Sequence, residues 1–147
     1  MAIQFTTYDP YKVIVTYNGL DFQGFAEGTF VEAERLQDGF TMKVGATGDV
    51  TRVKNRDRTG KVTVTLMAAS PTNDLLGQFY FLDEQDDVFD GGALQIKDMN
   101  GNMKCHADAA WIMKLPKIER GKDAQNVQWV FECADLDITP GGNESAI

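Results

Sequence analysis

Cysteine and histidine are scarce in this chain of 147 residues, which contains two cysteines and one histidine. Two cysteines are too few for a disulfide framework, and a structural zinc site needs about four ligands, most often Cys and His. The sequence has no apolar run near the roughly 20 residues that a membrane helix requires. Its opening, MAIQFTTYDP, contains no Lys or Arg and no apolar block. We therefore expect no signal peptide, membrane span, metal site or other cofactor.

Short catalytic motifs are missing too: the sequence has no G-x-x-x-x-G-K-[ST], G-x-S-x-G or H-E-x-x-H. The single histidine, His106, stands next to Cys105. Neighbouring residues on a strand point to opposite faces, so these two would not form a local nucleophile–base pair. We expect a structural histidine and a protein that is not an enzyme.

Carboxylates come in pairs two residues apart, at Glu32 and Glu34 and again at Asp135 and Asp137. Such pairs support glycoside chemistry only when they face each other across a cleft, and nothing in the sequence indicates one. The acidic stretch LDEQDDVFD, residues 82–90, lacks the spacing of a calcium-binding loop. Both features are typical of solvated surface.

Basic residues are few: 14 Lys and Arg stand against 22 Asp and Glu, for a net charge of −8. A nucleic-acid-binding protein normally presents a basic face, so this balance disfavours duplex binding by the chain as a whole. One basic island breaks the pattern, VTRVKNRDRTGK at 50–61, where Asp57 is the only acid. Its basic residues are Arg52, Lys54, Arg56, Arg58 and Lys61.

Most of the chain alternates with period two, which predicts strands. The segment 12–17 (KVIVTY) precedes Asn18-Gly19, a strong hairpin signal, and its partner is expected within 20–25. Further strand-like segments lie at 29–36, 40–44, 61–67, 93–99, 103–114 and 127–138. The apolar phase slips after Ala134, which we interpret as a bulge. The pattern predicts a mainly β fold: a β-sandwich or partial barrel of about eight strands.

One segment has helical spacing instead. Ser70-Pro71 places an N-cap residue before proline at the first helical position, and apolar residues then recur at helical intervals to Leu82. We predict one α-helix flanking the strands. Residues 1–147 form a single domain at this length, with an N-terminal arm at 1–10, an extended basic loop at 45–60 and a flexible tail at 139–147.

The basic loop is the main candidate for function. Its alternating basic residues would project to one side if the segment is extended. A solvated charged loop explains it equally well. The alternative is charge complementarity, in which a basic arm on one subunit meets the acidic surface of another and gives head-to-tail association.

Three segments resemble the tail tube proteins of contractile-tailed bacteriophages. They are TYDPYKVIVTYNGLDFQGFAEGTFVEAER at 7–35, VTLMAASPTNDLL at 64–76 and WVFECADLDI at 129–138. The resemblance extends over about residues 5–140 and consists of loose patterns without an invariant motif. It implies a β-sandwich or partial barrel with one flanking helix, a fold shared with the tube protein of type VI secretion systems.

The resemblance also implies an assembly. Hexameric rings would stack into a hollow tube inside a sheath, with tape measure protein in the lumen before DNA passes, and with baseplate and tail terminator proteins at the ends. The 45–60 loop would contact a neighbouring subunit or ring through Arg52, Lys54, Arg56, Arg58 and Lys61. The protein would be a virion component assembled in the host cytoplasm.

A conduit for DNA should not bind DNA, because each phosphate contact would slow its passage. We therefore expect an acidic lumen, with Glu32 and Glu34 as candidate lumen-facing groups. Two alternatives remain. One is a secretion-type tube protein. The other is a monomeric β-sandwich module that uses the 45–60 loop for an acidic ligand or single-stranded nucleic acid, although that loop has no aromatic residue on which a base could stack.

Overall fold

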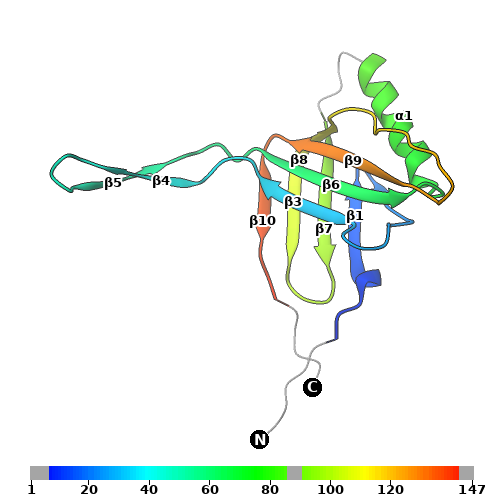
Figure 1. The fold of residues 1–147 in the computed structure, drawn as a ribbon, viewed down its shortest axis with the longest axis horizontal. Helices are drawn as coiled ribbons and strands as arrows, with labels where there is room; N and C mark the ends of the chain where they lie inside the picture. Colours follow the sequence, from blue (N-terminus) through cyan, green and yellow to red (C-terminus); the bar gives the residue numbers. More distant parts are fainter. Residues whose placement is uncertain (1–6, 86–90, 143–147) are drawn as a thin grey trace, which may run out of the picture.

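The computed structural model describes residues 7–85 and 91–142. Their strands form one eight-stranded antiparallel sheet in the order β2-β1-β7-β8-β9-β6-β3, with β10 also paired to β8, and a separate two-stranded ribbon, β4-β5 (Figure 1). The elements are η1 (Pro10–Lys12), β1 (Val13–Tyr17), β2 (Leu20–Asp21), β3 (Val31–Arg35), β4 (Phe40–Val44), β5 (Val50–Lys54), β6 (Gly60–Met67), α1 (Thr72–Gln85), β7 (Gly92–Asp98), β8 (Lys104–Ile112), β9 (Asn126–Cys133) and β10 (Leu136–Thr139). The predicted mainly β class with one α-helix is confirmed.

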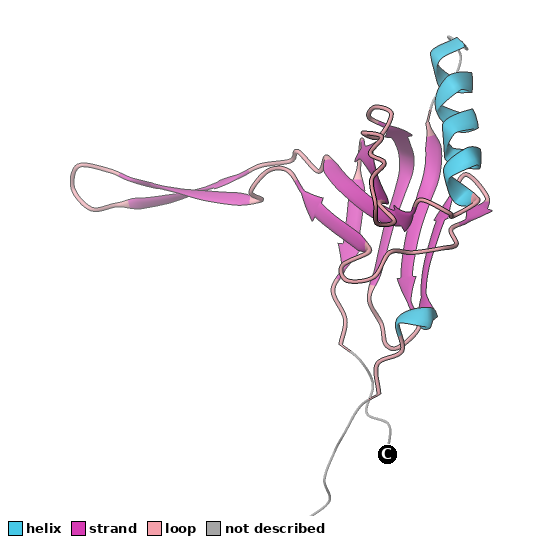
Figure 2. Ribbon diagram, turned by 45° about the vertical axis from the view of Figure 1, so that its right-hand side comes forward, coloured by secondary structure: helices cyan, strands magenta, loops and turns pink. Residues whose placement is uncertain are grey.

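The large sheet folds over on itself at β8 and β9, so that its two halves share one core (Figure 2). Alternate residues of each strand point inward, as the period-two pattern predicted. In β6, Val62, Val64 and Leu66 are fully buried, while Thr63 and Thr65 face the other way. Burying each such aliphatic side chain contributes about 1.5–3 kcal/mol. The result is a partial barrel.

Tyr17 brings a polar hydroxyl group into this core. Its ring packs 4.9 Å from that of Phe131, centroid to centroid, and its hydroxyl donates a hydrogen bond to the carbonyl oxygen of Ala110 over 3.0 Å. Burial raises the pKa of the phenol to about 12. The buried hydroxyl therefore stays protonated and has a hydrogen-bond partner, as buried polar groups generally do.

The first hairpin turns where the sequence predicted. Asn18 and Gly19 both adopt positive φ, 50° and 84°, the combination that a tight hairpin turn requires. Its second strand is shorter than expected, because β2 contains only Leu20 and Asp21. Phe22 then turns into the core, and the chain crosses to β6, where Phe25 forms an isolated bridge with Leu66.

The phase slip after Ala134 marks the end of a strand, so our interpretation as a bulge was wrong. The predicted single strand at 127–138 is two strands with different partners: β9 pairs with β6 and with the end of β8, whereas β10 pairs with β8 alone. Cys133 and Leu136 are both buried although they stand three residues apart. The break lets the chain turn the corner between the two halves of the sheet.

The helix begins close to the predicted position. The Ser70 hydroxyl accepts a hydrogen bond from the backbone N–H of Thr72 over 3.2 Å, and Asp74 lies in the first turn. Leu76 is fully buried, and Phe79 packs edge-on against Tyr17. Within the described part of the chain, no helix has both the length and the apolar composition that crossing a membrane would require.

Both ends of the described chain are bound to the body. The backbone N–H of Asp9 donates to the side-chain oxygen of Asn100 over 2.8 Å, and the amide of that Asn100 donates back to the Asp9 carbonyl over 2.9 Å. At the other end, the Asn102 N–H donates to the carbonyl of Gly142 over 3.4 Å. The rest of the predicted arm and tail, residues 1–6 and 143–147, lies outside the described residues.

Candidate assembly surfaces

The basic segment predicted as a loop at 45–60 is partly strand. Residues 50–54 form β5, which pairs in register with β4 from Phe40↔Lys54 to Val44↔Val50, and residue 60 already belongs to β6. The ribbon projects far from the body (Figure 1), and all ten of its strand residues are exposed. A five-residue turn at 45–49 closes it, with the Gly45 N–H donating to the Asp49 carbonyl over 2.8 Å.

The two faces of this ribbon differ in chemistry. Residues directly opposite on paired strands share a face. One face therefore combines apolar side chains with two cations, and we call it the docking face: Phe40, Met42, Val44, Val50, Arg52 and Lys54. The other face carries Thr41, Lys43, Thr51 and Val53. On the docking face the Arg52 guanidinium lies 4.5 Å above the Phe40 ring, a cation–π contact worth about 0.5–1 kcal/mol at an exposed site.

The base of the ribbon is held to the body, and this is where Arg58 lies. Its guanidinium forms ion pairs with Asp135, at 3.2 Å, and with Asp137, while its carbonyl accepts from the Leu136 N–H over 2.9 Å. Arg35 adds a hydrogen bond from Nε to the Leu136 carbonyl, also over 2.9 Å. Arg58 therefore contacts its own chain rather than projecting with the other basic residues. The carboxylate pair Asp135 and Asp137, noted in the sequence, thus serves to hold Arg58 in the folded chain.

Arg52, Lys54 and Arg56 are different. None of the ion pairs within the described residues involves any of the three, and all are exposed. Next to Arg56, the Asp57 carboxylate accepts hydrogen bonds from the backbone and hydroxyl of Thr59, and these bonds lower its pKa. Residues 55–59, which include Arg56, connect β5 to β6.

Glu32 and Glu34 lie on the outer face of β3, as expected for alternate residues of one strand, and both are exposed. In the register of β3, β6 and β9, Glu34 stands opposite Lys61, which stands opposite Glu132. Lys61 thus belongs to the sheet face and is separated from the ribbon. Because β3 is the last strand of the sheet, its outer backbone edge has no partner strand among the described residues.

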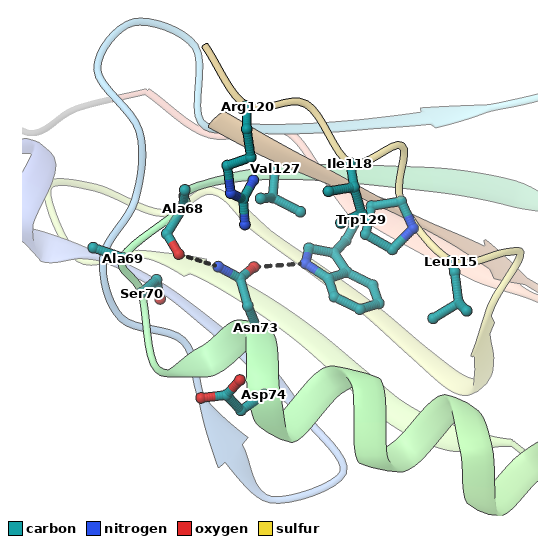
Figure 3. A pocket seen from close by; sticks show the side chains of 11 residues that line it. Ala68, Ala69, Ser70, Asn73, Asp74, Leu115, Ile118, Arg120, Val127 and Trp129 are labelled. Atoms are coloured by element: carbon teal, nitrogen blue, oxygen red, sulfur yellow. Dashed lines mark hydrogen bonds between the residues drawn. The ribbon is translucent and has the colours of Figure 1, made fainter. Parts of the chain in front are cut away.

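A groove of about 440 Å³ lies between the start of α1 and the segment after β8 (Figure 3). Leu115, Ile118, Val127 and Trp129 form apolar walls, and Figure 3 shows Arg120 and Asp74 on opposite sides. The Trp129 Nε1 donates to the side-chain oxygen of Asn73, whose amide donates in turn to the Ala68 carbonyl. Sequence reasoning missed this groove because three separate segments line it.

The remaining candidates for chemistry are placed by the sheet. Cys105 is buried and His106 faces outward, where its Nε2 lies 2.6 Å from Asp108 Oδ1. Burial raises the pKa of the Cys105 thiol, and raises that of Cys133 to about 11. Neither thiol is an activated nucleophile. The described residues contain no group of three or more His, Cys, Asp or Glu side chains that could hold a metal ion; Asp86, Asp87 and Asp90 of the acidic stretch lie outside them.

Comparison with known proteins decides the family. A family model described as "Bacteriophage PhiTE tail tube protein" matches residues 16–141. The chain belongs to this phage tail tube family. The tail tube protein is also 32% identical over 151 residues to "Structural protein ORF10" of Pseudomonas phage KPP10, covering 98% of this chain and 87% of that protein. The family resemblance expected from the sequence is confirmed, and the protein is a structural component of a phage tail.

Solved structures share the fold of this tail tube protein at low sequence identity. A chain of the sheath–tube complex of an extracellular contractile injection system matches with a TM-score of 0.60 and 12% identity, over 90% of this chain and 91% of that one. A chain of the sheath/tube terminator of the same kind of system matches with a TM-score of 0.64 and 11% identity, over 95% and 100%. The cap of the anti-feeding prophage matches with a TM-score of 0.62 and 13% identity, over 95% and 94%.

Proposed function

We propose that the protein forms the inner tube of a contractile phage tail, in hexameric rings that stack into a hollow conduit for DNA. The observation that carries the proposal is the β4-β5 ribbon, whose docking face is exposed along its whole length. Met42, Val44 and Val50 are each more than 60% exposed. A two-stranded ribbon is marginally stable at best in water. A surface of this kind fits a protein whose working form is an assembly.

The edge of β3 gives a second surface for the ring. An unpaired strand edge is a ready template for pairing with another chain, and soluble monomers normally protect it. Alternating Glu32 and Glu34 keep the edge acidic while the subunit is free. In the ring, pairing through β3 would continue the sheet from one subunit to the next and remove the open edge.

We assign the outer face of β3, β6 and β9 to the lumen. It carries Glu32, Glu34 and Glu132 against the single cation Lys61, together with Thr63 and Thr65. The carboxylates along this face would repel phosphates and leave DNA free to move. Arg52, Lys54 and Arg56 would then serve contacts between subunits or rings.

The partners follow from this role. The sheath would surround the tube, the tape measure protein would occupy the lumen during assembly in the host cytoplasm, and baseplate and tail terminator proteins would cap the ends. The protein would act without catalysis.

One alternative function gains from the structure. A monomeric module could hold single-stranded nucleic acid on the ribbon, because Phe40, which lies outside the predicted loop, adds an aromatic ring beside Arg52 and Lys54. Titration with a single-stranded oligonucleotide at low and moderate salt separates the two functions. The tube predicts no measurable binding at moderate salt, whereas salt-sensitive micromolar binding favours the module.

The proposal is tested by measuring the mass of the purified protein by light scattering while it is concentrated and aged. Negative-stain images are recorded from the same samples. We expect the mass to grow from the 16.3 kDa of one chain to large assemblies that appear as rings or hollow tubes. Protein that stays monomeric at every concentration, even with a pre-formed tail baseplate as a seed, would contradict it.

A further inference from the structure

The docking face of the ribbon and the outer face of α1 lie at opposite ends of the molecule. Figures 1 and 2 both show the ribbon extending from one side of the body and α1 standing at the other. One chain therefore cannot bring its own ribbon onto its own helix. Two copies can, and because the surfaces differ the contact is heterologous, which generates a ring or a helical filament when it repeats.

The helix presents a second exposed apolar surface. Leu75, Phe81 and Leu82 are 41%, 49% and 59% exposed. Leu75 and Leu82 stand seven residues apart, so they lie on one side of the helix, and Phe81 lies on the adjacent side, next to Asp74 and Glu84. No Lys or Arg occurs in α1. The outer face of α1 therefore has Leu75 and Leu82 along one edge and Glu84 along the other, with Asp74 and Phe81 between them.

The two surfaces match in chemistry and in length. On the ribbon, the row from Phe40 to Val44 spans about 14 Å at the rise of a strand. On the helix, Leu75 to Leu82 spans about 10 Å. Beside the apolar row the ribbon carries cations, and beside its row the helix carries acids. Opposite charge next to an apolar contact fixes the register of the two surfaces more than it adds affinity.

We propose that the docking face of one subunit's ribbon packs on the outer face of α1 of a second copy. Apolar side chains of β4 contact Phe81 and Leu82, and Arg52 and Lys54 pair with Asp74 and Glu84, which lie on either side of Phe81. This inference rests on the proposed tube function and names the surface that receives the ribbon. It also gives a partner to the exposed apolar residues of both elements.

A cysteine cross-link between copies tests the contact. One variant carries Met42→Cys on the docking face, and another carries Leu82→Cys on the helix; the native cysteines are buried. The mixture is allowed to assemble, oxidised mildly and run without reductant. We expect a disulfide-linked dimer in the mixture. A matched mixture with Thr41→Cys, on the opposite face of β4, should lack that band.

Images of the same samples keep this inference separate from the proposed function. Tubes without the Met42–Leu82 cross-link, or with an equal band from the Thr41→Cys mixture, would overturn the docking and leave the tube standing. The cross-link in solution without rings or tubes would support the docking and count against the tube. Absence of both would overturn both.

Charge exchange gives an independent readout. Reversal of the ribbon cations, Arg52→Glu with Lys54→Glu, should abolish assembly, and so should Asp74→Lys with Glu84→Lys on the helix. Combining all four substitutions in one chain restores opposite charge across the contact, so we expect assembly to return. If the four-fold variant assembles no better than either pair alone, the pairing is wrong.

Discussion

The indole Nε1 of Trp129 donates a hydrogen bond to the side-chain oxygen of Asn73 over 2.9 Å, and this contact joins β9 to the first turn of α1. The Asn73 amide also donates to the carbonyls of Met67 and Ala68, at the end of β6. A single side chain therefore connects the helix to two strands. The proposed assembly needs this connection, because α1 can receive the ribbon only if it is fixed to the body.

We predict that Asn73→Ala lowers the free energy of unfolding by about 1–3 kcal/mol, because it leaves the Trp129 N–H and two carbonyls without partners. Trp129→Phe keeps an aromatic ring but removes the donor, and the double variant should cost less than the sum of the two. Urea unfolding measures all three. Gln128→Ala, on the exposed side of β9, is the control and should change stability by less than about 0.5 kcal/mol. If the effects of the two single substitutions simply add in the double variant, the Trp129–Asn73 hydrogen bond contributes nothing to stability.

Two glycines should respond to alanine in opposite directions. A Cβ on Gly60 would lie 2.3 Å from a Leu136 methyl carbon and 2.6 Å from the Leu136 Cβ, so the strand or the side chain must shift. We expect Gly60→Ala to destabilise the protein by about 1–3 kcal/mol, as overpacking does. Gly77→Ala meets nothing within 4 Å inside α1 and should stabilise by about 0.5–1 kcal/mol. Thermal unfolding of both variants decides; a neutral Gly60→Ala would show that Leu136 is not held in place.

Two buried groups that can lose a proton, the Cys133 thiol and the Tyr17 hydroxyl, determine how stability depends on alkaline pH. Burial raises the pKa of Cys133 from 9.0 to about 11 and that of Tyr17 from 10.0 to about 12. Each group loses its proton more easily in the unfolded chain, so the unfolded state binds fewer protons at alkaline pH. Burial of the two protonated side chains therefore contributes fully to stability below pH 9. That contribution is lost as the pH rises through their folded-state pKa values, about 11 and 12. Urea unfolding between pH 7 and 11 should show this decline, and Cys133→Ala should make it shallower. Stability that rises over this range would contradict the burial.

The basic residues divide into two groups with different expected effects. Reversal of Arg52, Lys54 and Arg56 to Glu should change the melting temperature little, because no ion pair among the described residues uses them and only the Arg52–Phe40 contact on the ribbon is lost, yet it should prevent tube growth. Arg58→Glu instead places a carboxylate against Asp135 and Asp137 and should cost about 1 kcal/mol of stability. Circular dichroism and sedimentation give the two readouts. Normal tubes from the triple variant would remove these cations from the interface.

Much of the fold could be predicted from the sequence because local chemistry dictates it. The Asn18-Gly19 turn, the inward side chains of β6 and the start of α1 at Ser70-Pro71 each depend on residues close together in the chain. The free-standing ribbon was missed, although the segments at 40–44 and 50–54 have equal length around a turn with two glycines. Alternation predicts strands without saying which strands pair.

The candidate site was predicted only in part for the same reason. Arg52 and Arg58 look equivalent in a sequence of alternating cations, but Arg58 meets two carboxylates that the corner after Cys133 brings to the base of the ribbon. Phe40 lies outside the basic segment and reaches Arg52 only through strand pairing. The Trp129 groove depends on three separated segments. Contacts of this kind follow from the folded topology, which spacing along the chain does not encode.

The rotational order of the assembly tests the central claim most directly. End-on views of rings or short tubes, grown from the purified protein and imaged by cryo-electron microscopy, can be averaged without imposed symmetry. The account predicts hollow rings of six subunits, with the face that carries Glu32 and Glu34 toward the lumen. Solid filaments, rings of another order, or a lumen lined by Arg52 and Lys54 would contradict it.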